Sequence, residues 1–207
     1  KNIIAVTGTN GKTSIANFYQ QILNLNNIKV ASIGTLGVLS KKLNLKTKNT
    51  TIDPVSIHRT LQKLKKLSID NVIIEASSHG LKQQRLNNIK FKTALFTNLS
   101  RDHLDYHKSY KNYFNSKLIL FKKLLKKNSY AIFEDNLKIS TTLNRITKLK
   151  KIKKFTIGYN KSSFTILDHQ FLKSEQKILF RFENKQYYFS TRLIGSVPVS
   201  YTHLRAH

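Results

Sequence analysis

Short apolar runs alternate with longer segments of helical periodicity along about the first 150 residues. The apolar runs predict buried strands over residues 3–6, 29–33, 71–75, 92–97 and 130–133. Apolar residues three and four positions apart predict helices over residues 13–25, 53–67, 109–126 and 136–145. Because the two kinds of element alternate, the pattern predicts an α/β fold, in which a mostly parallel sheet carries helices on both faces.

The pattern changes after about residue 153. Short runs with strand character, joined by polar turns, follow at residues 155–159, 164–167, 177–182 and 187–193. Strands that follow one another without helices between them favour antiparallel pairing. We therefore expect an α/β core over about residues 1–150 and a small antiparallel β appendage over about residues 151–195.

Composition excludes some classes of protein. The 207 residues are 40% hydrophobic, which suffices for one sizeable core, and they include no Cys, which excludes disulfides and thiolate metal sites. No apolar run approaches the roughly 18 residues of a membrane span. No charged-then-apolar leader precedes the first predicted strand, so we expect a cytoplasmic protein.

The formal net charge of +27 raises the question of a nucleic-acid partner. The lysines are scattered rather than gathered in one stripe, and aromatic residues do not interleave with them at single-strand-binding spacing. We therefore expect no nucleic-acid partner. A basic, non-catalytic nucleic-acid-binding domain remains a rival interpretation, which salt-dependent DNA binding without nucleotide affinity would favour.

A glycine-rich loop joins the first predicted strand to the first predicted helix. It reads Gly8-Thr9-Asn10-Gly11-Lys12-Thr13-Ser14, and Val6 stands where the common phosphate-binding loop has its first glycine. Glycines let backbone N–H groups approach an anion, a lysine here reaches outer phosphates, and a threonine hydroxyl here holds Mg²⁺. The loop therefore predicts a phosphate site, despite its short spacing.

Polar side chains follow two further predicted strands. Glu75 ends one apolar run, where an open parallel sheet places its ligands, and a carboxylate there can hold Mg²⁺ or orient water. The loop after it carries Ser77, then Gln83 and Arg85, and from residue types alone it can equally be an ordinary polar loop. The segment after the next strand contains two Asp and two His, among them His103, which leaves a metal site there open.

Five segments together resemble the Mur ligases, ATP-dependent enzymes that form amide bonds in peptidoglycan synthesis. They are GTNGKTS at residues 8–14, Asn49-Thr50-Thr51, EASSHGLKQQR at residues 75–85, FTNLSRDHLDYH at residues 96–107 and YKNYFNSK at residues 110–117. The first is shared with folylpolyglutamate synthases, which are a second rival interpretation. The segments at 75–85 and 96–107 resemble the MurE branch, which adds meso-diaminopimelate or L-lysine to UDP-N-acetylmuramoyl-L-alanyl-D-glutamate.

The resemblance implies roles for individual residues. It implies an ATP site formed by Gly8, Thr9, Asn10, Gly11, Lys12, Thr13 and Ser14. It implies Mg²⁺ ligands at Thr13 and Glu75, a second Mg²⁺ at His103, and catalytic roles for Lys12, Glu75, His103 and Lys117. Lys117 matches the family lysine that CO₂ converts to a carbamate, which can ligate Mg²⁺. Contacts to the UDP-sugar-dipeptide are implied for Asn49, Thr50, Thr51, Ser77, Gln83 and Arg85.

The resemblance covers about residues 2–195, the central domain of such a ligase. We expect the N-terminal and C-terminal ligase domains to be absent from this chain. We expect the chain to be monomeric and inactive alone. The sequence does not determine which amino acid is added. Residues 133–136 depart from the sequence pattern of the family, so we assign no nucleotide contact to that segment. Residues 196–207 contain no Lys, Asn or Ile, which make up about a third of the chain, so we expect that tail to be non-native.

Overall fold

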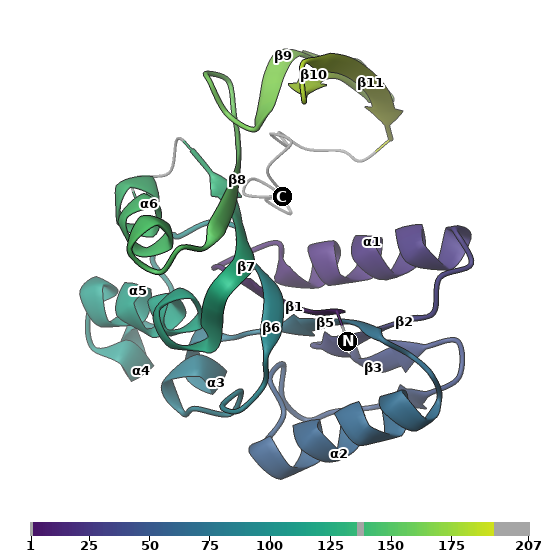
Figure 1. Cartoon of the computed structure of the whole chain (residues 1–207), viewed down its shortest axis with the longest axis vertical. Coiled ribbons are helices and arrows are strands. Elements are labelled where there is room, and N and C mark those ends of the chain that lie inside the picture. Colours follow the sequence, from purple (N-terminus) through teal and green to yellow (C-terminus); the bar gives the residue numbers. More distant parts are fainter. Residues whose placement is uncertain (1, 136–138, 193–207) are drawn as a thin grey trace.

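The structure, a computed structural model, describes residues 2–135 and 139–192. Its sheet has eleven strands in the order β11-β10-β9-β8-β7-β6-β1-β5-β2-β3-β4 (Figure 1). The strands are β1 (Asn2–Thr7), β2 (Val30–Gly34), β3 (Gly37–Ser40), β4 (Asn44–Leu45), β5 (Asn71–Glu75), β6 (Phe91–Phe96), β7 (Leu125–Glu134), β8 (Lys153–Gly158), β9 (Phe164–Phe171), β10 (Gln176–Phe182) and β11 (Lys185–Thr191). The helices are α1 (Lys12–Leu25), α2 (Pro54–Lys66), α3 (Ser78–Lys82), α4 (Leu104–His107), α5 (Tyr110–Ile119), the π-helix η1 (Leu120–Leu124) and α6 (Ser140–Leu149).

The middle of the sheet is parallel. β5 and β6 flank β1, while β2 on one side and β7 and β8 on the other continue the parallel order. Antiparallel pairs lie at both ends, in β2–β3–β4 and in β9–β10–β11. Parallel strands are usually joined by long crossover connections, and from β1 to β8 these connections contain helices. This arrangement confirms the predicted α/β class with an antiparallel C-terminal segment.

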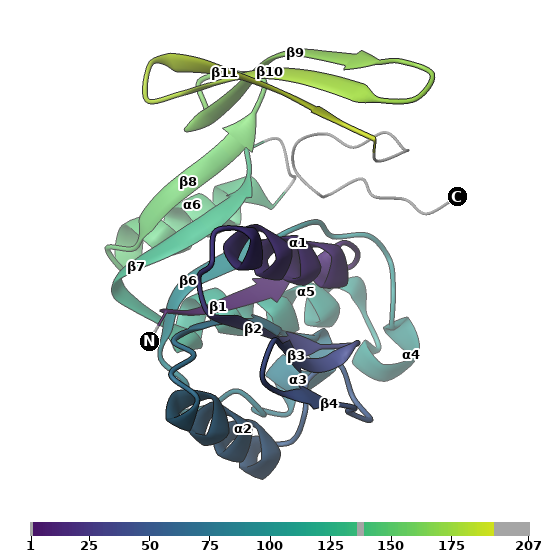
Figure 2. The same ribbon diagram turned by 90° about the vertical axis from the view of Figure 1, so that its right-hand side faces the viewer.

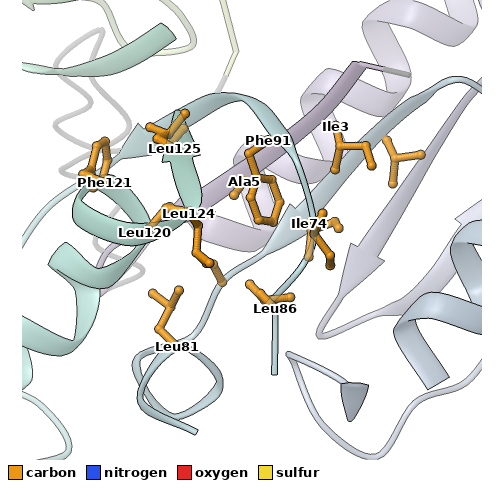
Figure 3. Packing of buried hydrophobic residues seen from close by; sticks show 14 of the residues in the cluster. Ile3, Ala5, Ile74, Leu81, Leu86, Phe91, Leu120, Phe121, Leu124 and Leu125 are labelled. Carbon is orange, nitrogen blue, oxygen red and sulfur yellow. The ribbon is translucent and has the colours of Figure 1, made fainter. Parts of the chain in front are cut away.

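Alternation along the central strands divides the side chains between two layers of helices. In β1, Ile3 and Ala5 belong to the large core that α2, α3, η1 and α6 cover, whereas Ile4 and Val6 pack with residues of α1. Successive strand residues point to opposite faces, so one strand serves both layers. Figure 1 shows α1 on one side of the sheet and α2 on the other, and Figure 3 shows the larger core around Phe91. Helices on both faces are therefore confirmed.

The pairing of β8 differs from the expectation. The sequence pattern places residues 155–159 in the antiparallel appendage, but β8 pairs parallel with residues Tyr130 to Glu134 of β7. The parallel pairing therefore extends through β8 to the first residues of β9, where Ile157 pairs with Phe164. The strands β9, β10 and β11 project beyond the helical layers (Figure 2). Aromatic rings continue the packing along this extension: Phe155 lies beside Phe164, which stacks on Phe182 with 4.3 Å between ring centroids.

The helix expected over residues 109–126 is too long. α5 ends at Ile119, one turn of π-helix follows, and Leu125 already belongs to β7, where it pairs with Phe91. Lys150 explains where the helix ends, because its ammonium donates to the carbonyls of Phe121 (3.2 Å), Lys122 (2.8 Å) and Leu125. Phe121 and Lys122 lie in η1, where the last carbonyls have no following helical N–H, so the ammonium of Lys150, which follows α6, satisfies this helix end.

Other differences are smaller. The helix expected over residues 136–145 is α6, shifted towards the C-terminus, and residues 136–138 lie outside the described residues. The short elements β3, β4, α3 and α4 have too few residues for a periodic pattern and were not predicted. Residues 196–207 also lie outside the described part, so their non-native origin stays a prediction. In the described ranges, no helix is long and apolar enough to cross a membrane.

Replacing Lys150 by Met should destabilise the fold. Burial lowers the pKa of Lys150, and its removal leaves two or more carbonyls at the end of η1 without a donor. We expect the free energy of unfolding, measured in urea, to fall by about 1–3 kcal/mol. Lys148→Met, at an exposed position on the same helix, is the control. Equal unfolding midpoints for the two variants would show that Lys150 does not stabilise this helix end.

Candidate functional site

The two glycines of the phosphate loop occupy positions where a side chain would not fit or would strain the backbone. Gly11, which precedes α1, has φ 82° and ψ −4°, a left-handed conformation that glycine adopts without steric cost. Gly8 lies so close to the end of β6 that an added Cβ would stand 1.8 Å from the Thr97 hydroxyl oxygen. The loop can therefore pass beside β6 and turn into α1 only with glycine at these two positions.

Two side chains that directly follow β6 hold the phosphate loop by hydrogen bonds. The Thr97 hydroxyl donates to the carbonyl of Asn10 (2.6 Å). The Asn98 side-chain oxygen accepts from the backbone N–H groups of Thr9 (3.1 Å) and Asn10 (2.9 Å). The sequence analysis missed Asn98, although its position directly after a predicted strand at the same sheet edge was a usable signal. These bonds hold the loop in shape before any ligand arrives.

The Glu75 carboxylate is buried at the end of β5 and held by three donors. Its oxygens accept from the Thr13 hydroxyl (2.9 Å), the Thr35 hydroxyl (3.1 Å) and the Thr35 N–H (3.0 Å). An added Cβ on Gly34 would lie 2.0 Å from the carboxylate, so β2 approaches it closely. The hydroxyl and the carboxylate bring oxygen atoms together, which is the donor type that Mg²⁺ prefers.

Two lysines converge on one carbonyl of the loop. Lys12 donates to Gly8 O (2.9 Å) and Thr9 O (2.7 Å), and Lys117 of α5 also donates to Gly8 O (2.7 Å). Lys117 is 1% exposed, so it is not one more surface lysine. Burial, reinforced by the Lys12 charge, holds the pKa of Lys117 well below its ordinary value, although Asp102 acts against this shift.

Histidine rings gather next to this lysine pair. His103 has φ 51°, a left-handed conformation that is uncommon for residues other than glycine, and its Nε2 lies 3.4 Å from Asp102. The His103 ring meets the ring of His79 edge-on at 4.9 Å. His107 is fully buried and its Nε2 bonds to the Ser78 hydroxyl (3.0 Å); burial lowers the pKa of His107 to about 4, so this ring is neutral.

A cavity of about 280 Å³ lies beside these groups at the carboxyl edge of the sheet. Its walls are Thr9, Asn10, Gly11, Lys12, Thr13, Ser14, Thr35, Thr50, Ser77, Ser78, His103, Tyr113 and Lys117. The structure thus brings the predicted phosphate loop together with His103, Lys117, Thr50 and Ser77, while Glu75 joins through Thr13. In residues 2–135 and 139–192, no three His, Asp or Glu side chains cluster as a metal site.

The remaining predicted substrate residues do not line this cavity. The Thr51 hydroxyl donates to Glu75 O (2.7 Å), and Arg85 donates to Thr51 O (2.6 Å), so both residues brace the end of β5. Gln83 donates to the Tyr106 hydroxyl (3.1 Å). Asn49 instead lines a neighbouring basic cavity of about 400 Å³ between the β3–β4 hairpin and α2.

The chain is similar to known proteins along most of its length. The family model of the Mur ligase middle domain matches residues 6–201. The UDP-N-acetylmuramoyl-L-alanyl-D-glutamate–2,6-diaminopimelate ligase of Rickettsia bellii (strain RML369-C) is 41% identical over 97% of this chain and 43% of its own length. The protein of the same name from Chelativorans sp. (strain BNC1) is 36% identical over 95% of this chain and 41% of its own. The chain therefore spans about two fifths of these relatives.

Solved structures show the same arrangement. A structure of UDP-N-acetylmuramoyl-L-alanyl-D-glutamate–2,6-diaminopimelate ligase superposes with a TM-score of 0.84 at 28% identity, over 97% of this chain and 41% of that one. MurF from Acinetobacter baumannii (TM-score 0.73, 14% identity) covers 94% of this chain and 39% of its own. An FPGS–AMPPCP complex superposes with a TM-score of 0.68 at 13% identity, over 94% of this chain and 55% of that one. At such low identity, the last two share the fold alone.

The depressed pKa of Lys117 should make stability depend on pH. The unfolded chain keeps the Lys117 proton up to its ordinary pKa, whereas the folded chain releases it at lower pH, so the unfolded state binds more protons in between. The free energy of unfolding should therefore rise with pH in that window, by up to about 1.4 kcal/mol per unit. Urea unfolding at several pH values measures this rise.

Lys117→Met should remove that contribution, and the difference between the two stability curves isolates it from the other titrating groups. Lys111→Met, exposed on the same helix, should keep the rise. Parallel stability curves for the wild-type chain and Lys117→Met would contradict the assignment of a depressed pKa.

Proposed function

The chain belongs to the Mur ligase family, as a middle domain of the MurE type, and we propose that it provides the ATP-binding and acyl-transfer part of such a ligase. In the proposed reaction, ATP phosphorylates the terminal carboxylate of UDP-N-acetylmuramoyl-L-alanyl-D-glutamate, an amine attacks the acyl phosphate, and ADP and phosphate are released. The relatives named above are called 2,6-diaminopimelate ligases, which favours that amino acid over L-lysine.

One observation carries this proposal: the phosphate loop, the Thr13–Glu75 oxygen pair and the buried Lys117 surround one cavity, and Thr50 and Ser77 line its wall. A phosphate site alone fits many proteins. A phosphate site beside a carboxylate, a buried lysine and polar groups for a second substrate fits a reaction in which a phosphoryl group passes between two ligands.

The nucleotide would lie along the loop and the start of α1. Backbone N–H groups at a helix N-terminus suit phosphate oxygens, and the left-handed Gly11 turns the chain there. Lys12 would have to leave Gly8 O and Thr9 O to reach the outer phosphates, which the flexible lysine stem allows. Thr13 and Glu75 fit Mg²⁺, which when bound neutralises charge that develops on the transferred phosphoryl group.

Lys117 would act after modification by CO₂. Only an unprotonated amine adds CO₂; its nitrogen bonds to the carbon, and one proton is released as the carbamate forms. Burial favours the unprotonated amine, which supports this proposal. The carbamate would then offer oxygen atoms to Mg²⁺ in the same cavity as His103, where an ammonium could not serve as a ligand.

The second substrate would approach from the side of Thr50 and Ser77. The Ser77 hydroxyl accepts from the Gly80 N–H (3.1 Å) and lies 3.0 Å from the Thr51 hydroxyl oxygen, so its orientation is fixed. Arg85 donates to Thr51 O through one nitrogen, and its other N–H groups suit carboxylate and phosphate oxygens of a substrate that reaches it. Because the chain spans about two fifths of its relatives, we propose that it binds nucleotide but does not complete ligation alone.

Replacing Lys12 by Ala tests the nucleotide site. We expect the affinity of the 207-residue chain for Mg·ATP, measured by isothermal titration calorimetry, to fall at least tenfold, because a charged contact to phosphate is lost. In the complete ligase the same change should abolish ADP formation. Lys29→Ala, an exposed lysine just before β2, is the matched control and should bind normally. Unchanged Mg·ATP affinity of Lys12→Ala would refute the assignment of the loop.

A further inference from the structure

Tyr113 is the one side chain in α5 that touches both the phosphate loop and Lys117 in the described part of the molecule. It is fully buried, and its hydroxyl lies 3.1 Å from the Thr9 hydroxyl. The Lys117 nitrogen lies 4.4 Å from the centroid of its ring. The His103 and His107 rings lie 6.2 and 5.2 Å away.

The hydroxyl end of Tyr113 donates to the loop. A threonine hydroxyl has one donor and two acceptor positions. The Thr9 hydroxyl donates to Ser100 O (3.3 Å) and accepts from the Ser100 N–H (3.0 Å), which leaves one acceptor position for the Tyr113 proton. Burial raises the pKa of Tyr113 to about 12, so the hydroxyl keeps its proton at neutral pH.

The ring end of Tyr113 covers Lys117. The two residues are four positions apart on α5, so their side chains lie on the same face of the helix. The ring lies against one side of the Lys117 nitrogen, which donates to Gly8 O (2.7 Å). Tyr113 therefore reaches the loop twice, through its own hydroxyl at Thr9 and through Lys117 at Gly8.

We propose that Tyr113 is a positioning residue that holds the phosphate loop and the Lys117 amine in a fixed position relative to each other. This inference rests on the proposed function, because their relative position matters only if both serve one bound nucleotide. The hydroxyl and the ring have separate tasks, so substitutions can remove them one at a time.

Tyr113→Phe removes the hydroxyl and keeps the ring. The affinity of the 207-residue chain for Mg·ADP should fall about 3- to 10-fold, the effect of one lost hydrogen bond. The amide resonance of Ser100, which donates to the same Thr9 oxygen, should shift in the ¹H–¹⁵N spectrum. Tyr130→Phe, on β7, is the matched control and should change neither. Wild-type affinity and an unmoved Ser100 resonance in Tyr113→Phe would overturn the proposal.

Tyr113→Leu removes the ring as well. Lys117 should then be acetylated by acetic anhydride several times faster than in the wild-type chain, as mass spectrometry of the labelled peptide reports, because water and reagent reach its nitrogen. Tyr113→Phe should label at the wild-type rate. Equal labelling of Lys117 in all three proteins would show that the ring does not cover it.

The two proposals fail in different ways. If the wild-type chain does not bind Mg·ADP, the proposed nucleotide function fails, while the Ser100 resonance and the labelling of Lys117 still decide whether Tyr113 holds both groups. If the wild-type chain binds Mg·ADP and Tyr113→Phe binds it equally well, the nucleotide function stands and the positioning role is wrong.

Discussion

The site depends on one constraint of the fold: the carboxyl ends of the neighbouring parallel strands β1, β5 and β6 lie at the same edge of the sheet. The phosphate loop follows β1, Glu75 ends β5, and Thr97 and Asn98 follow β6. The order of the strands alone therefore brings together three segments that are far apart in the sequence. The loop is held by hydrogen bonds to the β6 end, and its first helical turn is joined to β5 by the Thr13–Glu75 bond. Any change that moved one of these strands would open the cavity.

Burial of charge gives this edge its chemical character. Lys12 and Lys117 share the carbonyl of Gly8, and burial lowers the pKa of both. For Lys12, the negative charges of Glu75 and Asp102 oppose the lowering of the pKa, which suits the phosphate contact proposed for this residue. For Lys117, which is more deeply buried, Asp102 is the acid that opposes the lowering. The two lysines therefore differ in their surroundings, and the proposed function uses that difference: Lys12 would serve as a cation and Lys117 as an unprotonated amine.

Sequence reasoning found what depends on local pattern and missed what depends on tertiary contact. The strand–loop–helix order and the acid at the end of β5 follow from apolar periodicity, so the loop and Glu75 were placed correctly at one edge. Leu125 fits a helical spacing as well as a strand, and only Lys150 and the pairing with Phe91 decide between them. The role of Asn98 and the double contact of Tyr113 depend on distances across about 90 to 100 residues of chain, which no periodicity encodes.

Paramagnetic NMR with Mn²⁺ in place of Mg²⁺ tests most directly whether nucleotide and metal meet at this edge. Mn·ADP added to the ¹⁵N-labelled chain should broaden first the amide resonances of Gly11, Thr13, Thr35 and Glu75, and should leave those of β9–β11 sharp. Broadening centred on another part of the sheet, or none at saturating Mn·ADP, would contradict the assignment of the site.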